Sequence, residues 1–401
     1  MMKQQIRWRR TLLCTALAAA VTVAALLVLP PRIAPADARR LFESPRSAWE
    51  GALLLWHLGG WRTAAGSRGE QLARVAAWYE NRNKGLYIQI ENITAEQFSA
   101  RLAAGRQPDI LTWPGGMVSP ETLPLVPVPR GQEFESALVP AIPWVEDGAL
   151  AVPWVWGGTV VLINADMAAR RSAALPAGPD WTANELLTLA AQLAHRTGRS
   201  QSIQVYGIAA AGEGLLCFTG PGAAALPDGV LDPAATLWQT WESFAGGRAG
   251  ILMGSQWEAA AIERLRGQGK GFEVLVMPVP RDLAQPLQVQ WMCVVDSGEA
   301  ARSDMAVDFV AALLSAENQS VISEKTGCLS AVRGRSGSGA VRDMLLSAAA
   351  RGAVVLPGPF SQLAETVVLE AALGDEAARR AVSARCFYLQ PPCIHKGDDV
   401  E

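Results

Sequence analysis

The chain has 401 residues, of which half are hydrophobic and 18% are charged. This composition excludes wholesale disorder, and the length allows two domains with separate cores. The formal charge of −3 gives no general attraction for nucleic acid, so no nucleic-acid partner is expected. Fourteen tryptophans stand against four tyrosines. Since a buried indole N–H needs a hydrogen-bond partner, this excess predicts that some tryptophan ring faces are exposed.

The N-terminal segment, residues 1–38, has the pattern of a signal peptide or a signal anchor. Residues 1–10 carry four positive charges, and Leu12–Leu29 is an uncharged, mostly apolar run that ends at Pro30-Pro31. The run is just long enough to cross a bilayer, and Ala36-Asp37-Ala38 resembles a cleavage site. Positive charge before the run predicts that everything after it is extracytoplasmic, either periplasmic or at the cell surface. Both cleavage and retention as a membrane anchor remain open.

A linker is expected over residues 39–49, followed by alternating strand and helix patterns that predict an α/β fold. Thr182 and Glu185 have the spacing of a capping box, which predicts a helix from there to His195. The other expected helices are Ser67–Asn81, Ala95–Ala104, Thr236–Phe244, Asp304–Ser315, Asn318–Thr326, Ala364–Leu373 and Glu376–Ala384. The expected strands are Leu53–His57, Tyr87–Ile93, Asp109–Trp113, a β-rich segment Ala151–Met167, Val205–Ala209, Glu273–Met277 and Gln288–Val295. In addition, Ala249–Trp257 is expected to be a strand that runs into a tryptophan turn and a helix.

Cysteine and histidine spacing gives no sign of a metal site, and neither a metal nor a cofactor is expected. Five cysteines follow the N-terminal segment at irregular intervals, which is not a disulfide framework, although Cys386 and Cys393 are near enough to pair. The Gly59-Gly60 and Gly157-Gly158 pairs lack the spacing of a dinucleotide or phosphate loop. They are expected to allow tight turns and a close approach of the backbone.

Six segments occur in the order in which similar segments occur in one protein family. They are LLLWHLGGWRTAAGSRGEQLARVAAWYENRN, Pro108-Asp109-Ile110, VPWVWGGTVVLINADM, DWTANELLTLAAQL, FAGGRAGILMGSQW and DMAVDFVAALLSAENQSVISEKTGCLSAVRG. Together they span Gly51–Gly334 and resemble the family 1 extracellular solute-binding proteins of ABC importers, which mostly carry sugars.

The resemblance implies a two-lobe periplasmic-binding-protein-like fold, in which a hinge joins two α/β lobes around an interlobe cleft. The first lobe is expected over residues 50–162 plus 247–294, and the second over residues 163–246 plus 295–401. Residues 209–243 are roughly half of what the family has at this point, which predicts a shortened second lobe.

Ligands of open α/β sheets bind beyond the carboxyl ends of the strands. This rule selects Gly60, Trp61 and Arg62 after the first strand, and Ser255 and Trp257 after a later one. An indole face stacks on the apolar face of a sugar ring, while polar side chains bind its hydroxyl groups. The resemblance adds residues near the expected lobe crossings and one strand start: Trp154, Trp156, Gly157, Trp291 and Asp109. For each tryptophan, packing in the core is the competing explanation, and for Asp109 it is a structural turn.

An enzyme is not expected, since no acid and base pair is recognisable. Glu146 and Asp147 are adjacent, so their side chains diverge, and no G-x-S-x-G motif accompanies His57 and Ser255. Two hypotheses remain. In the favoured one, the protein binds a carbohydrate or similar small polar solute by hinge closure and delivers it to an ABC permease. In the alternative, it is a membrane-anchored sensor or interaction protein on a degenerate solute-binding fold.

Overall fold

The computed structural model of the protein describes residues 46–197, 202–220, 223, 225–227, 229–232, 237–336, 339–351 and 354–389. The predicted targeting segment, residues 1–38, and Cys393 lie outside this part of the chain. The predicted linker is shorter than expected, because the strand β1 (Arg46–Leu58) already begins at Arg46. Within the ranges given, no helix combines the length and the apolar composition that a membrane crossing requires.

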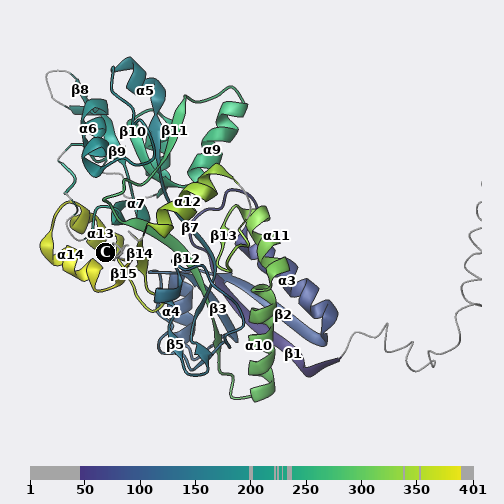
Figure 1. Cartoon of the computed structure of the whole chain (residues 1–401). Coiled ribbons are helices and arrows are strands. Elements are labelled where there is room, and N and C mark those ends of the chain that lie inside the picture. The colour runs from purple at the N-terminus through teal and green to yellow at the C-terminus, as the bar shows by residue number, and fades with distance from the viewer. Residues whose placement is uncertain are drawn as a thin grey trace, which may run out of the picture.

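The first lobe is built on a five-strand sheet with the order β2-β1-β3-β12-β7 (Figure 1). β1 is parallel to both β2 (Lys84–Ile93) and β3 (Ile110–Pro114). β12 (Gln285–Val295) is antiparallel to β3 and to β7 (Val152–Asn164). The helices of this lobe are α3 (Arg68–Arg82), α4 (Ala95–Ala103), α10 (Ala300–Leu313) and α11 (Ala316–Thr326).

Local sequence explains where the first helices begin. Ser67 and Glu70 form a capping box at the start of α3, and Thr94 and Gln97 form another at the start of α4. The apolar face of α3 carries Leu72, Val75 and other buried residues, as its periodicity predicts. Helix α10 packs on both α3 and β1, so the C-terminal half of the chain helps to cover the first sheet.

The second lobe continues from the same strand, β7. Its last residues pair antiparallel with β10 (Ala249–Ser255) on one side and β11 (Val274–Pro278) on the other. β9 (Ser202–Ala209) is parallel to β10, and β8 (His195–Thr197) lies beyond it. The predicted helix from Thr182 ends at Leu193, and His195 therefore belongs to a strand. The helices here are α5 (Ala165–Arg170), α6 (Ala183–Leu193), α8 (Leu237–Ala245) and α9 (Gln256–Gly267).

β7 is the shared strand of the two lobes. Residues 152–158 pair with β12, whereas residues 159–164 pair with β10 and β11, so the change of lobe falls between Gly158 and Thr159. All thirteen residues of β7 are buried, which agrees with its near-continuous apolar sequence. In Figure 1, β7 and β12 lie between the upper group of β8 to β11 and the lower group of β1 to β3.

This pairing requires a correction to the expected lobe boundaries. β10 and β11 fall in residues 247–294, which were assigned to the first lobe, yet their partners are strands of the second. Conversely, α10 and α11 were assigned to the second lobe but pack on α3 of the first. We therefore propose a first lobe of residues 46–158 plus 285–334, and a second lobe of residues 159–284 plus 339–389.

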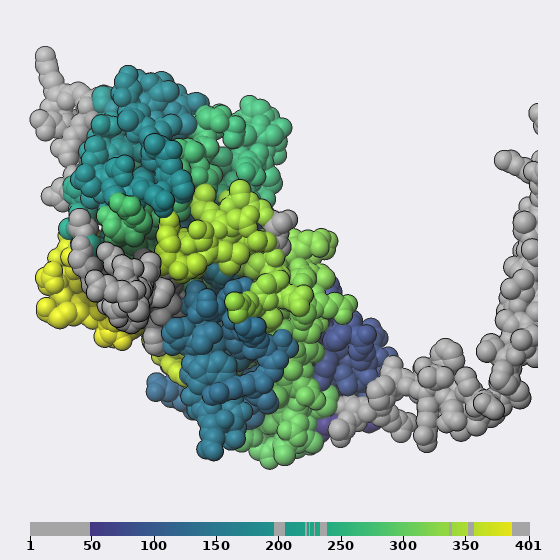
Figure 2. Space-filling model, in the orientation of Figure 1, coloured from purple at the N-terminus to yellow at the C-terminus, as the bar shows by residue number. Residues whose placement is uncertain are grey.

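The C-terminal part returns across the lobe boundary. β13 (Leu329–Ser330) pairs with β7, and α12 (Ala340–Ala350) packs on β7, β11 and α9. In Figure 2 the yellow-green residues of this region lie between the teal second lobe and the blue part of the first. β14 (Val354–Pro357) pairs with the start of β12 and with β15 (Cys386–Leu389). The remaining elements are β4 (Leu125–Val126), a 3₁₀ turn at Val139–Ala141, β5 (Trp144–Val145), β6 (Gly148–Ala149), α7 (Glu213–Leu216), α13 (Glu365–Ala372) and α14 (Glu376–Ser383).

Candidate functional site

The loop between β1 and α3 carries the predicted site residues Gly60, Trp61 and Arg62. Trp61 is only 7% exposed, and the Arg68 guanidinium lies 4.3 Å from the centre of its ring. Arg68 Nη2 also donates a hydrogen bond of 2.6 Å to the Trp61 carbonyl oxygen. These two contacts hold Trp61 in place. A Cβ on Gly60 would lie 2.8 Å from the Pro114 Cβ, so only glycine lets this loop approach the end of β3 so closely.

The facing wall comes from the start of α9, where β10 ends. Ser255 caps the helix by accepting a hydrogen bond from the Trp257 N–H, and the Glu258 carboxylate accepts one from the Ser255 N–H at 2.8 Å. Gln256 Oε1 accepts a hydrogen bond of 3.2 Å from the Gly158 N–H. The start of α9 is therefore tied to β7 at the residue where the chain changes lobe.

Trp257 connects this wall with the first lobe. The Arg62 guanidinium lies 4.6 Å from the centre of the Trp257 ring, in a cation–π arrangement across the two lobes. Trp257 also packs against Trp241 in an edge-to-face arrangement, with ring centres 5.3 Å apart. Trp61, Arg62, Ser255 and Trp257 thus come together, although nearly 200 positions separate the two segments in the chain.

Three cavities open around Trp61. The first, which we call the acidic cavity, has a volume of about 170 Å³. The first lobe contributes Gly60, Trp61, Arg62 and, from β12, Gln288 to its lining. The second lobe contributes Glu213, Ser255 and Glu258. The apolar cavity, about 350 Å³, shares Gly60, Trp61 and Glu213 with the acidic cavity and adds Met117, Leu216, Glu365 and Val368. The loop groove, about 720 Å³, is lined by His57, Trp61, Arg62, Arg68 and Trp257. The acidic and apolar cavities together form an interlobe cleft.

Two buried polar atoms at the cleft have no hydrogen-bond partner among the residues that the structure describes. They are the Trp61 Nε1 donor and the Gln288 Oε1 acceptor, on side chains that are 7% and 6% exposed. An unpartnered buried polar group costs about 1–3 kcal/mol of stability. Both atoms are therefore suited to bind a polar molecule that enters the cleft.

Glu213 lies between the acidic and apolar cavities and is the most perturbed acid of the cleft. Burial raises the pKa of its carboxyl group above the usual value. Hydrogen bonds from its own backbone and from Gln288 counteract this shift, whereas the negative charges of Glu365 and Glu258 add to it. The cleft thus holds a carboxyl group whose charged form is disfavoured by burial and is stabilised when a cation approaches.

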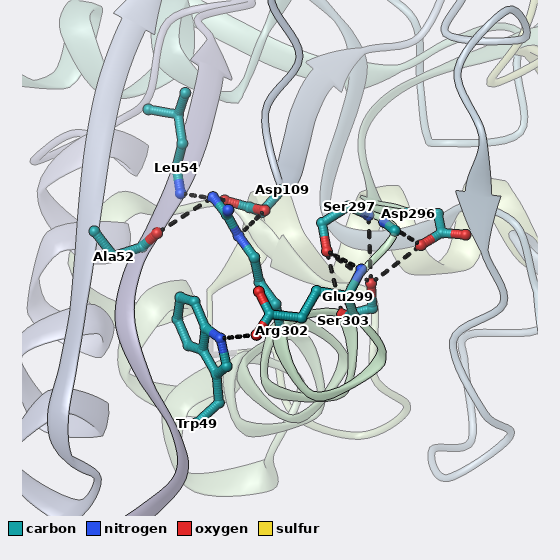
Figure 3. Close-up of polar contacts among 10 residues, drawn as sticks. Trp49, Ala52, Leu54, Asp109, Asp296, Ser297, Glu299, Arg302 and Ser303 are labelled. Carbon is teal, nitrogen blue, oxygen red and sulfur yellow. Dashed lines mark hydrogen bonds and ion pairs between the residues drawn. The ribbon is translucent and has the colours of Figure 1, made fainter.

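Asp109 does not belong to the cleft, which corrects the predicted site. Its carboxylate accepts a hydrogen bond of 2.7 Å from the Leu54 N–H and forms ion-pair contacts of 2.7 and 2.8 Å with the Arg302 guanidinium (Figure 3). Both carboxylate oxygens are used in this way, and Asp109 lines none of the cavities above. Its role is to fix β1, β3 and α10 against one another.

Three of the predicted tryptophans pack in the core instead of lining a cavity. Trp154 Nε1 donates to Thr112 Oγ1 at 3.0 Å, and Trp156 Nε1 donates to the Ser330 carbonyl oxygen at 2.8 Å. Trp291 is fully buried. A Cβ on Gly157 would lie 2.4 Å from Gln256 Nε2, so this glycine makes room for α9 beside β7 rather than for a ligand. Packing in the core, rather than contact with a ligand, therefore explains Trp154, Trp156, Gly157 and Trp291.

The sequence did not predict several residues of the cleft, above all Glu213, Glu258 and Gln288. Glu258 and Gln288 could have been recognised from a sequence pattern. Ser255 and Glu258 have capping-box spacing, and Gln288 is a polar residue within a strand that is buried throughout. Glu213 had none, because it lies in the four-residue helix α7 within a Gly- and Ala-rich segment.

The loop groove contains His57, which predicts a dependence of stability on pH. Burial lowers the pKa of His57 from 6.5 to about 3, and the charge of Arg68 acts in the same direction. Between pH 6.5 and about pH 3, His57 is protonated in the unfolded chain but neutral in the folded chain. The free energy of unfolding therefore decreases as the pH is lowered. We expect a loss of about 2 kcal/mol between pH 7 and pH 5 from this residue. Urea unfolding of His57→Gln should show a decrease smaller by that amount, and equal decreases in both proteins would contradict this account.

Within the described ranges, no three His, Cys, Asp or Glu side chains group in a way that would hold a metal ion. The described cysteines Cys217, Cys293, Cys328 and Cys386 are buried and unbonded. Cys393, the expected partner of Cys386, lies outside the described ranges.

The sequence and the fold both match known binding proteins. The sequence model of the family described as bacterial extracellular solute-binding protein matches residues 74–338, about two thirds of the chain. No curated protein matches the chain.

Among solved structures, the cyclic α-maltosyl-1,6-maltose binding protein from Arthrobacter globiformis has a TM-score of 0.57 at 16% identity, over 84% of this chain and 97% of that one. The GacH receptor of Streptomyces glaucescens, solved unliganded and with acarbose, has a TM-score of 0.57 at 14% identity, over 84% and 96%. The maltose/maltodextrin-binding domain MalE from Bdellovibrio bacteriovorus, bound to maltotriose, has a TM-score of 0.53 at 13% identity, over 83% and 97%. At such low identity these likenesses establish the two-lobe fold.

Proposed function

The chain belongs to the bacterial extracellular solute-binding proteins, and we propose that it binds a carbohydrate in the cleft around Trp61 by closure of the two lobes. A hinge of this kind, with a ligand held between two lobes, is a common form of domain closure. The structural neighbours support the choice of ligand, since several of their names specify sugars or acarbose.

One observation carries the proposal. Both lobes and the strand β12 contribute side chains to a single cleft, and two buried polar atoms in it, Trp61 Nε1 and Gln288 Oε1, have no partner among the described residues. Sugar hydroxyl groups both donate and accept hydrogen bonds, so a sugar can supply a partner for each of these atoms. The Trp61 side chain adds the apolar surface that a sugar ring needs.

Delivery to an ABC permease follows from this function as part of the same proposal. We further propose that residues 12–29 act as a signal peptide or as a membrane anchor, which would hold the binding lobes near such a permease. No enzymatic activity is proposed, since the cleft serves to bind and release a solute.

The test is a ligand screen of the full chain, purified in detergent, by thermal shift and by intrinsic tryptophan fluorescence. The library contains mono- and oligosaccharides, polyols and amino acids. A saccharide that raises the melting temperature and changes the emission supports the proposal, because binding to the folded state alone stabilises it. Hits confined to amino acids would overturn the carbohydrate assignment. Silence across the library would favour the membrane-anchored sensor or interaction protein instead.

A further inference from the structure

The acidic cavity is unusually rich in hydrogen-bond acceptors. Glu213 and Glu258 line it, and Glu365 lines the adjoining apolar cavity. Gln288 is only 6% exposed, and its Oε1 is an additional acceptor that has no partner among the described residues. A carboxylate accepts hydrogen bonds and cannot donate them, so a ligand here must bring donors.

No ion pair within the described part of the protein neutralises the negative charge of this cluster. None of the three glutamates forms an ion pair with a described lysine, arginine or histidine. Arg62 lines the same cavity, but its guanidinium lies over the Trp257 ring. Glu258 has a structural task, because its carboxylate accepts from both the N–H and the hydroxyl of Ser255. The Glu213 carboxyl group accepts hydrogen bonds from its own backbone and from Gln288, and it lies where the two cavities meet.

Removing a charged side chain from water costs free energy unless an opposite charge lies close to it. A protonated primary amine is the group that suits this position, since it carries one positive charge and three donors in a small volume. It can approach Glu213 and Gln288 Oε1 together, while hydroxyl groups of the same molecule reach Trp61 Nε1. A neutral sugar supplies the hydroxyl groups but offers no positive charge to stabilise the charged form of Glu213.

We propose that the cleft selects an amino sugar, with its protonated amine bound between Glu213 and Gln288. This inference rests on the proposed carbohydrate function and narrows it to one class of solute. It assigns Glu213 as the residue that discriminates an amine from a hydroxyl group.

The experiment compares sugars that differ only in this group. Glucosamine, galactosamine, mannosamine and the glucosamine disaccharide of chitosan are titrated calorimetrically into the full chain, each beside its hydroxyl counterpart, glucose, galactose, mannose or cellobiose. At least one amino sugar is expected to bind ten or more times more tightly than its counterpart. Its affinity should fall as salt is raised, because charge attraction is screened.

Variants locate the effect. Glu213→Gln keeps the shape and removes the charge, so the affinity ratio between the amino sugar and its hydroxyl counterpart should fall to less than threefold. Glu324→Gln, at an exposed position of α11, is the matched control and should retain the full preference. The melting temperature of ligand-free Glu213→Gln shows whether the variant folds, and it should be no lower than that of the unaltered chain.

The failure of this inference differs from the failure of the proposed function. If every hydroxyl sugar binds at least as tightly as its amino counterpart, or if only neutral saccharides bind, the amino-sugar inference is wrong and carbohydrate binding stands. The inference also fails if Glu213→Gln retains the preference. If no saccharide of either kind binds to the folded chain, both are overturned.

Discussion

Replacement of Trp61 by alanine is expected to weaken binding of the solute by about 30-fold, which corresponds to about 2 kcal/mol. Trp61 is the one side chain that lines all three cavities, and its Nε1 has no partner among the described residues. Its loss removes apolar contact area and a donor at the centre of the cleft. The dissociation constant, measured calorimetrically with the saccharide found in the screen, checks this result.

Two further variants make the interpretation of Trp61→Ala specific. Trp61→Phe keeps an aromatic ring beside Arg68 but lacks the N–H, and should show an intermediate loss. Trp154→Phe removes an indole whose N–H is satisfied by Thr112 within the core, and its dissociation constant should remain within twofold of the unaltered value. Equal losses from Trp154→Phe and Trp61→Ala would show that the cleft around Trp61 is not the binding site.

The second large effect is expected on stability rather than on binding. Asp109→Ala should lower the free energy of unfolding by about 3 kcal/mol, because it leaves the Arg302 guanidinium and the Leu54 N–H without the carboxylate that they share. Asp109 is buried, with only 5% of its side chain exposed, whereas Arg302 is one-third exposed, so water relieves part of the cost. Urea unfolding measures the change, and the affinity for the solute should not move.

An exposed ion pair provides the control for Asp109→Ala. Glu133 and Arg333 pair across the surface of the first lobe with 72% and 62% of their side chains exposed. Because water screens this pair, Glu133→Ala should lower the free energy of unfolding far less than Asp109→Ala does. If Asp109→Ala costs no more than Glu133→Ala, the network in Figure 3 does not hold β1, β3 and α10 together as described. If folded Asp109→Ala binds the solute more weakly than the unaltered chain, Asp109 contributes to the binding site.

Much of the fold could be predicted, because many of its elements are determined by neighbouring residues. The helices α3, α4 and α6 begin at capping boxes that the sequence displays, and β7 is a near-continuous apolar run. The lobe boundaries were harder. They depend on which strands pair with each half of β7, and the pairing of Ser255 with Thr159 joins residues that no local pattern connects. Helix α12 was missed, because it starts at Gly339 without a side-chain cap.

The candidate site was predictable only in part, for a similar reason. Gly60, Trp61 and Arg62 follow the end of β1, and Ser255 is the last residue of β10, which is where the general rule for open sheets places ligands. The tryptophans of β7 looked equally suitable in sequence. Their indole groups are satisfied by Thr112 and Ser330, which lie far away in the chain and close only in space. Glu213 could not be recognised in the sequence, because the short helix that carries it has no sequence signal. In the structure this helix brings Glu213 to the same cavity as Trp61.

The measurement that tests the central claim most directly is the distance between the lobes with and without the solute. Fluorophores on Ser99→Cys of α4 and Arg170→Cys of α5, both exposed positions, report this distance by energy transfer, while the four described native cysteines are buried. Closure around the cleft predicts that energy transfer rises to a plateau as the saccharide is added. The midpoint of this rise should equal the calorimetric dissociation constant. In Trp61→Ala the midpoint should shift to a higher saccharide concentration. Saccharide binding without any change in transfer would contradict a solute-binding protein that works by closing its lobes.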